Sequence, residues 1–254
     1  MQQPKERDAV RILVTGSADG LGRSAAESLL AAGHDVVVHA RSQERAAALE
    51  PLITRGAELV VGDFSDPDAV RRAAAELNAG NPLDSVIHNA GVARSTAVMP
   101  VNVVAPYLLT ALLDGPRRHV YLSSNDHYAG RASLAGVDWQ GRTAGSYADS
   151  KLYVTAFSAA LARLRPDLLS NSVDPGWVPT KMGGPGAPDD LALGHQTQEW
   201  LASSEDPDAL TSGGYWYHRR QRQPHPAVND VEFQDSLLHA LEDETGTPLQ
   251  DSGR

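Results

Sequence analysis

The chain reads Val-Arg-Ile-Leu-Val-Thr-Gly-Ser-Ala-Asp-Gly-Leu-Gly over residues 10–22. Its first part, residues 10–15, is an apolar run without alternation, which is typical of a strand buried on both faces. An Ala-rich stretch with helical spacing follows at residues 22–32. A glycine turn between a strand and a helix lets the backbone approach a phosphate group, and the helix end supplies N–H groups and positive dipole. The stretch therefore favours an α/β fold with a phosphate site over a plain glycine-rich turn.

Segments of the same two kinds alternate along the rest of the chain. We expect strands at residues 10–15, 35–40, 57–61, 83–88, 119–123, 168–173 and 213–218. We expect helices at residues 22–32, 43–49, 68–77, 101–113, 146–164, 191–201 and 230–242. This alternation, with no linker and no internal repeat, predicts a single-domain, Rossmann-type doubly wound parallel sheet with helices on both faces over residues 1–254.

The composition excludes several classes of function. The chain has no cysteine, which removes disulfides, thiolate metal sites and cysteine nucleophiles. A formal net charge of −10 disfavours nucleic acid and anionic membranes as partners. No leader-like apolar segment and no run of about 20 apolar residues is present, so we expect a cytoplasmic protein. We expect no metal, because the histidines lack ligand spacing; this applies to His119, His195, His218 and His225.

Several motifs follow the glycine turn in a fixed order. The turn itself has the spacing Gly-x-x-x-Gly-x-Gly, at Gly16, Gly20 and Gly22. The later motifs are Asp63, His88-Asn89-Ala90-Gly91, Asn102, Tyr147-Ala148-Asp149-Ser150-Lys151 and Asp174-Pro175-Gly176-Trp177-Val178-Pro179-Thr180. Each motif alone is weak, but in this order they resemble the short-chain dehydrogenase/reductase family along nearly the whole chain.

The resemblance implies a nicotinamide dinucleotide held along these motifs. In the family, the residue matching Asp63 hydrogen-bonds the adenine, and those matching Val178 and Thr180 contact the nicotinamide carboxamide. The cofactor-binding residues so implied are Gly16, Ser17, Asp19, Gly20, Leu21, Gly22, Asp63, Phe64, Asn89, Ala90, Gly91, Tyr147, Lys151, Pro175, Gly176, Val178 and Thr180.

The end of the second strand favours NADP(H) over NAD(H). An acidic residue there would accept hydrogen bonds from the ribose 2′-hydroxyl of NAD, but Ala40 stands at that place. Arg41 follows, and its planar guanidinium suits a 2′-phosphate, to which Ser42 can donate a further hydrogen bond. The alternative is that Arg41 is a solvated surface charge. Arg23 could assist, although a surface role suits it better.

Tyr147 and Lys151 lie four residues apart on an expected helix and so share a face. A free tyrosine, with a pKa of about 10, is a poor base near neutral pH, and a nearby ammonium lowers that pKa. Such pairs are common on ordinary helices, so the accompanying motifs decide. By resemblance, Tyr147 transfers the proton, Ser124 orients the substrate oxygen, and Lys151 with Asn102 relays the proton. Ser123 is the alternative serine, because successive strand residues face opposite ways.

Two segments point to the substrate side. The stretch between Ser124 and Tyr147 is long, and with the tail at residues 213–217 it resembles the retinol-dehydrogenase-like branch. His127 and Tyr128 suit either a pocket lining or a structural role. The Gly- and Pro-rich segment at residues 177–203 predicts a lid that orders on binding. Its Met182, Leu191, Leu193 and Trp200 suit an apolar pocket wall, with core packing as the alternative for the last three.

The sequence thus predicts an NADP(H)-dependent oxidoreductase acting on a small carbonyl or alcohol. A catalytically inactive NADP-binding sensor or regulatory protein is the main alternative, because fold does not fix function. A dehalogenase or lyase fits less well, since the glycine turn is intact. The resemblance also implies a homo-oligomer, a dimer or a tetramer.

Overall fold

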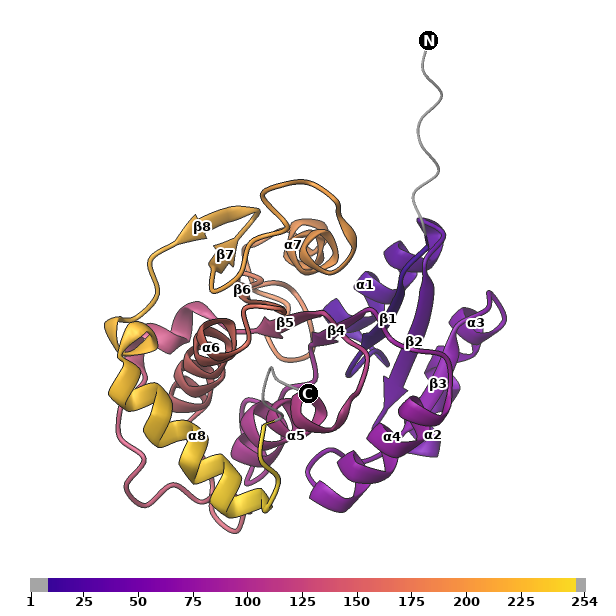
Figure 1. Cartoon of the computed structure of the whole chain (residues 1–254). Helices are drawn as coiled ribbons and strands as arrows, with labels where there is room; N and C mark the ends of the chain where they lie inside the picture. Colours follow the sequence, from indigo (N-terminus) through magenta and orange to yellow (C-terminus); the bar gives the residue numbers. More distant parts are fainter. Residues whose placement is uncertain (1–8, 250–254) are drawn as a thin grey trace.

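The structure is a computed structural model that describes residues 9–249. One eight-stranded sheet runs through these residues in the order β3-β2-β1-β4-β5-β6-β7-β8 (Figure 1). The strands are β1 (Arg11–Val14), β2 (Asp35–Ala40), β3 (Glu58–Val61), β4 (Ser85–His88), β5 (Arg118–Leu122), β6 (Leu169–Asp174), β7 (Tyr215–Tyr217) and β8 (Arg220–Arg222). All neighbours pair in parallel except β7 and β8, which pair antiparallel.

Helices connect the strands. They are α1 (Gly20–Ala31), α2 (Gln43–Ala46), α3 (Glu50–Ile53), α4 (Pro67–Ala79), α5 (Ala105–Leu112), α6 (Tyr147–Leu164), α7 (Leu191–Ser203) and α8 (Val231–Thr245). Shorter turns of helix are η1 (Ala47–Leu49), η2 (Pro100–Val104), η3 (Asn125–Ala129) and η4 (Pro226–Asn229). Among residues 9–249, no helix combines the length and apolarity needed to cross a membrane.

The sheet separates two apolar cores. Leu13 points into the core that α4, α5, α6 and α8 cover, whereas its neighbours Ile12 and Val14 point into the core beneath α1 and α7. The same alternation holds in β5, where Tyr121 lies in the first core and Val120 in the second. Figure 1 shows α1 and α7 on one side of the sheet and α5, α6 and α8 on the other. This confirms the doubly wound fold and explains the apolar runs, since both faces of each strand are buried.

The structure differs from the expected elements in detail. The helix expected at 101–113 begins with a π-helical turn, η2, and the one expected at 43–49 breaks into α2, η1 and α3. The final strand, expected at 213–218, covers only Tyr215–Tyr217, and the chain then turns back into β8. The sheet is therefore parallel except for one antiparallel edge strand, which the sequence analysis missed.

The strand order places a ligand-binding edge. From β1 the chain builds outward through β2 to β3, and then returns to the other side of β1 to build β4 and β5. In open α/β sheets, ligands bind at the carboxyl ends of the strands where the order reverses in this way. The order reverses between β1 and β4. The glycine turn follows β1 there, and the residues after His88 follow β4.

Candidate active site

The glycine turn after β1 is built by close approach of backbones. Gly16 has φ 67°, and a Cβ there would lie 2.9 Å from Ala90 Cα. A Cβ on Gly22 would overlap Asn89 Nδ2 and lie 2.5 Å from the Gly16 carbonyl oxygen. The Asn89 amide donates to the carbonyl oxygens of Thr15, at 2.8 Å, and Gly16, at 3.2 Å. Side chains are thus excluded at Gly16 and Gly22, and Asn89 holds the turn from the end of β4.

The amino end of α1 offers a cradle for an anion. Asp19 holds the N-cap position of this helix but makes no side-chain capping hydrogen bond. Its carboxylate instead pairs with Arg45 and, at 2.9 Å, with Lys181 Nζ, and these groups lower its pKa against the opposing effect of burial. The first-turn amides are therefore not capped by Asp19. Backbone amides at a helix end, with no Cβ in the way, fit a pyrophosphate.

His39, which the sequence analysis missed, supports the turn from β2. Its Nδ1 accepts the Gly16 N–H at 2.9 Å, and its Nε2 lies 2.8 Å from the Gly62 carbonyl oxygen, so Nε2 carries the proton. Its ring stacks on Phe64 with the centroids 3.8 Å apart. Burial lowers its pKa to about 4, against the opposing effect of the Gly62 contact. A neutral imidazole thus joins three strand ends around the turn.

Some residues implied as cofactor contacts have partners within the protein. Ser17 is fully buried, and its hydroxyl donates to the Val14 carbonyl and accepts the His39 N–H. Phe64 is buried against His39. Asp63 is exposed, with one carboxylate oxygen accepting from Ser65 N–H and hydroxyl. Asp63 can therefore still reach a ligand, whereas the side chains of Ser17 and Phe64 have roles in the fold.

Arg41 and Ser42 lie directly after β2, on the same edge as the glycine turn. Arg41 is exposed, and its guanidinium has no hydrogen bond or ion pair with any described residue. Ser42 caps α2 by accepting the Arg45 N–H at 3.3 Å. Arg45, whose pairing with Asp19 was not foreseen, adds a second guanidinium here, while Arg23 is engaged by Glu27 and the Ala48 carbonyl.

Tyr147, Ser124 and Lys151 come together at the carboxyl end of β5. Tyr147 opens α6 and is hydrogen-bonded to the side chain of Ser124. Lys151 Nζ lies 5.4 Å from the centre of the Tyr147 ring and donates to the Leu122 carbonyl oxygen at 2.6 Å. Ser123 points the other way, with its hydroxyl 2.6 Å from that of Thr155, and is buried. Of the two serines, Ser124 therefore faces the tyrosine.

Burial dominates the pKa values of this group. It raises the pKa of Tyr147 to about 12; the Ser124 hydrogen bond opposes the change, and the charges of Asp126 and Asp174 add to it. Burial also lowers the pKa of Lys151 to about 8. Lys151 does not contribute to the raised pKa of Tyr147, and its own lowered pKa still leaves it largely protonated near neutral pH.

Asn102 lies in the π-helical turn η2, on the other side of the same group. Its side chain bonds both the N–H and the carbonyl of Val92, each at 2.9 Å, and donates to Ser150 Oγ at 2.9 Å. A Cβ on Gly91 would lie 3.5 Å from Asn102 Oδ1 and 3.6 Å from Lys151 Nζ. Asn102 and Lys151 thus flank Gly91, and π turns are frequent at functional sites.

The segment after β6 lies over the same edge. Gly20 and Thr180 meet there, since a Cβ on Gly20 would lie 3.3 Å from Thr180 Cγ2. Gly176 has φ 83° and packs on Asp189, whose carboxylate accepts the Trp177 N–H at 2.6 Å. Residues 177–190 form turns, but residues 191–203 form α7, and its Trp200 lies in the core. Of the residues expected to form a lid, only those before α7 lack a regular helix, and Trp200 belongs to the core alternative.

Three large apolar side chains are exposed on the segments that follow Ser124 and β6. Tyr128 is 44% exposed, Trp177 60% and Met182 50%. The long segment before Tyr147 has two contacts with α6: Tyr153 donates to the Ser133 carbonyl at 2.6 Å, and Trp139 packs beside Tyr153. His127 is buried and takes the structural role, not a lining one.

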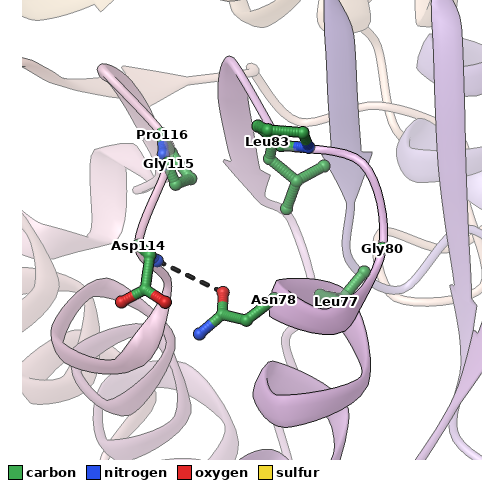
Figure 2. A pocket seen from close by; sticks show the side chains of 8 residues that line it. Leu77, Asn78, Gly80, Leu83, Asp114, Gly115 and Pro116 are labelled. Atoms are coloured by element: carbon green, nitrogen blue, oxygen red, sulfur yellow. Dashed lines mark hydrogen bonds between the residues drawn. The ribbon is translucent and has the colours of Figure 1, made fainter.

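A separate pocket lies at the amino ends of the strands, opposite the carboxyl ends that carry the residues described above. Figure 2 shows it between the end of α4 and the connection from α5 to β5, with Asp114 N–H donating to Asn78 Oδ1 at 3.2 Å. Leu83 and Gly115 close it at the amino ends of β4 and β5. It is therefore remote from Tyr147. Within the described residues, no group of three or more His, Asp or Glu side chains is placed to hold a metal ion.

Comparison with known proteins places this arrangement in a family. The family model for short chain dehydrogenase matches residues 10–115. A short-chain dehydrogenase of Penicillium rubens is 36% identical over 255 residues, covering 94% of this chain and 98% of its own. The chain belongs to the short-chain dehydrogenase/reductase family. It is thus an oxidoreductase of that family, and an uncharacterized oxidoreductase of Emericella nidulans is 35% identical, covering 93% of this chain and 97% of its own.

More distant members of the family are similar too. Human retinol dehydrogenase 13 is 28% identical, over 87% of this chain and 80% of its own, so the retinol-dehydrogenase likeness holds at lower identity. A solved structure of an uncharacterized Mycobacterium paratuberculosis protein superposes with a TM-score of 0.78 at 23% identity, covering 97% of each chain. A short chain dehydrogenase from Shigella flexneri complexed with NADP gives 0.68 at 24% identity, covering 84% of this chain and 98% of its own. These two structures bear out the fold.

Proposed function

We propose that this short-chain dehydrogenase/reductase transfers a hydride between NADP(H) and a carbonyl or alcohol carbon, with Tyr147 as the acid and base. The observation that carries the proposal is the convergence of Tyr147 with Ser124 and with Lys151, whose Nζ lies 5.4 Å from the centre of the phenol ring, on the edge that holds the glycine turn. The nicotinamide, when bound, supplies or accepts the hydride.

The residues of the chain divide the remaining work. In the reducing direction the Tyr147 hydroxyl gives its proton to the substrate oxygen, which Ser124 orients. Lys151, with a pKa lowered to about 8, is suited to return a proton to the phenolate near neutral pH. The residues that would hold the cofactor are Gly16, Gly20, Leu21 and Gly22 at the pyrophosphate, Arg41 and Ser42 at the 2′-phosphate, Asp63 at the adenine, Lys151 at the ribose, and Val178 and Thr180 at the carboxamide.

The substrate side favours an apolar carbonyl compound. Tyr128, Trp177 and Met182 expose large apolar surfaces on the two segments that begin at the Ser124 and Asp174 strand ends. Apolar side chains around a few placed polar groups are the usual lining of a small-molecule site. NADP(H) as the cofactor is supported by Arg41 and by the NADP complex of the Shigella relative.

The test is NADPH consumption over a panel of aromatic ketones, aldehydes and quinones, with the wild type and Tyr147→Phe. Removing the hydroxyl should cost at least about 100-fold in kcat, because no group then supplies the proton. NADPH binding, followed by its fluorescence, should remain. Unchanged turnover in Tyr147→Phe would reject the mechanism. A wild type that binds NADPH but reduces nothing would favour the sensor alternative.

A further inference from the structure

The turn that carries Ser124 is fixed by one imidazole. Directly after β5, Ser124 leads into the short helix η3. The Ser124 carbonyl oxygen receives the His127 N–H at 3.1 Å and lies 2.8 Å from Nδ1 of the His127 ring. A carbonyl oxygen can only accept, so Nδ1 must carry a proton. His127 therefore makes two contacts with the backbone carbonyl of Ser124, the residue whose side chain faces Tyr147.

The other ring nitrogen faces a distant part of the chain. His127 Nε2 lies 3.0 Å from the backbone nitrogen of His225, which follows β8. An amide can only donate, so Nε2 must present its lone pair. The imidazole is thus required to be neutral and protonated at Nδ1 alone. Burial lowers the pKa of His127, with His225 adding to the change, which keeps the ring neutral.

Two aromatic rings pack against this imidazole. His127 is completely buried, and its ring contacts Tyr128 and Tyr215 with centroid distances of 4.0 Å and 4.5 Å. Tyr128 donates its hydroxyl proton to the Gln223 carbonyl, two residues before His225. Tyr215 also reaches Asp174, at 3.4 Å. The Ser124 turn and the segment from β7 to His225 are therefore joined through several contacts around one imidazole.

We propose that His127 is a positioning residue for Ser124, coupling the turn that carries this hydroxyl to the backbone at His225. The proposal rests on the proposed function, since Ser124 matters there as the group that orients the substrate oxygen. It assigns the segment that follows the C-terminal hairpin, β7 and β8, a part in catalysis at a distance: the His225 backbone holds His127, and His127 holds the Ser124 carbonyl.

Two substitutions separate the two bonds of the ring. In His127→Asn the side-chain amide occupies the place of Nδ1, so it can still donate to the Ser124 carbonyl but cannot reach His225. In His127→Gln the amide oxygen occupies the place of Nε2, so it can accept from His225 but leaves the Ser124 carbonyl. Both variants create a similar loss of packing. Ser85→Ala, which removes a 2.6 Å bond to the Ala202 carbonyl at the other end of the sheet, controls for destabilisation alone.

The experiment measures kcat and KM with 9,10-phenanthrenequinone and NADPH, melting temperature, and NADPH binding. We expect His127→Gln to lower kcat by about 10-fold more than His127→Asn, since small misplacements of a catalytic group are costly. Melting temperatures of the two should fall alike, NADPH binding should hold, and Ser85→Ala should keep its kcat. Equal kcat values in His127→Asn and His127→Gln would overturn the proposal.

A second readout does not depend on turnover. The ¹⁵N and ¹³C shifts of the His127 ring should show a neutral imidazole protonated at Nδ1, the minor form of histidine in water. Protonation at Nε2 would overturn the proposed contact. If the wild type binds NADPH but reduces neither this quinone nor any compound of the panel, the proposed function fails, and the ring tautomer alone then decides whether the contact with Ser124 exists.

Discussion

At the scale of one residue, the proposed preference for NADP(H) depends on Arg41. It follows β2 directly, is exposed, and has no ion pair or hydrogen bond among residues 9–249. Ser42 beside it caps α2, and Arg45 one turn further pairs with Asp19. A planar guanidinium without a partner, next to a helix amino end, suits a phosphate and gains little from a ribose hydroxyl.

Arg41→Ala should therefore weaken NADPH without weakening NADH. A hydrogen-bonded charge contributes about 1.5–3 kcal/mol, so we expect KM for NADPH to rise about 10-fold or more. Initial rates with each cofactor over a concentration series measure the ratio. Arg23→Ala is the matched control, since its guanidinium bonds Glu27 and the Ala48 carbonyl and should not alter the ratio. An equal loss for both cofactors would contradict the role of Arg41.

At the scale of the element, the strand–turn–helix unit from β1 to α1 depends on two backbones meeting. Asn89 at the end of β4 reaches the carbonyl oxygens of Thr15 and Gly16, and Gly22 leaves the room for it. A glycine inside a helix ordinarily costs about 1 kcal/mol relative to alanine. Glycine is nevertheless needed at position 22, because the methyl group of an alanine would enter the turn.

Gly22→Ala should thus destabilise, against the usual helix preference. Its methyl would overlap Asn89 Nδ2 and lie 2.5 Å from the Gly16 oxygen, and such overpacking costs about 1–3 kcal/mol. We expect a lower melting temperature and at least a tenfold loss in NADPH affinity. The control is Gly186→Ala, where nothing lies within 4 Å of the added Cβ and the melting temperature should hold. Normal NADPH binding by Gly22→Ala would contradict the assignment of this turn as the pyrophosphate site.

The elements differ in how far the sequence predicts them. The strands of the parallel sheet were found because their residues are buried on both faces and leave apolar runs. Strand β8 was missed because the β7–β8 turn is made by His218 and Arg219, at φ 48° and 57°, where two-residue hairpins usually have Asn or Gly. Alternation implied only that one of Ser123 and Ser124 could face the site, and the family resemblance chose Ser124. His39 acts on backbone atoms remote in sequence, which no local pattern reveals.

At the scale of the whole molecule, three histidines are sealed in the sheet as neutral rings. Burial lowers the pKa of His39 and of His119 to about 4, and lowers that of His88 well below its ordinary value. His88 Nε2 lies 3.2 Å from His119 Nδ1, so the pair shares one proton between the facing nitrogens. In the unfolded chain each imidazole takes up a proton near pH 6.5.

The free energy of unfolding should therefore fall as the pH drops from about 7 to 5. In that window the unfolded chain binds protons that the folded protein does not, so His39 and His119, with pKa values of about 4, each cost about 2 kcal/mol of stability at pH 5, and His88 acts in the same direction. Above about pH 8 all are neutral in both states, and their contribution disappears. Urea unfolding at pH 8, 7 and 5 measures the change, and His119→Gln should reduce the difference between pH 7 and 5 by about 2 kcal/mol. A free energy of unfolding that stays flat from pH 7 to 5 would mean that these rings take up protons in the folded protein as readily as in the unfolded chain. The sheet would then not exclude water from the base of the cofactor edge.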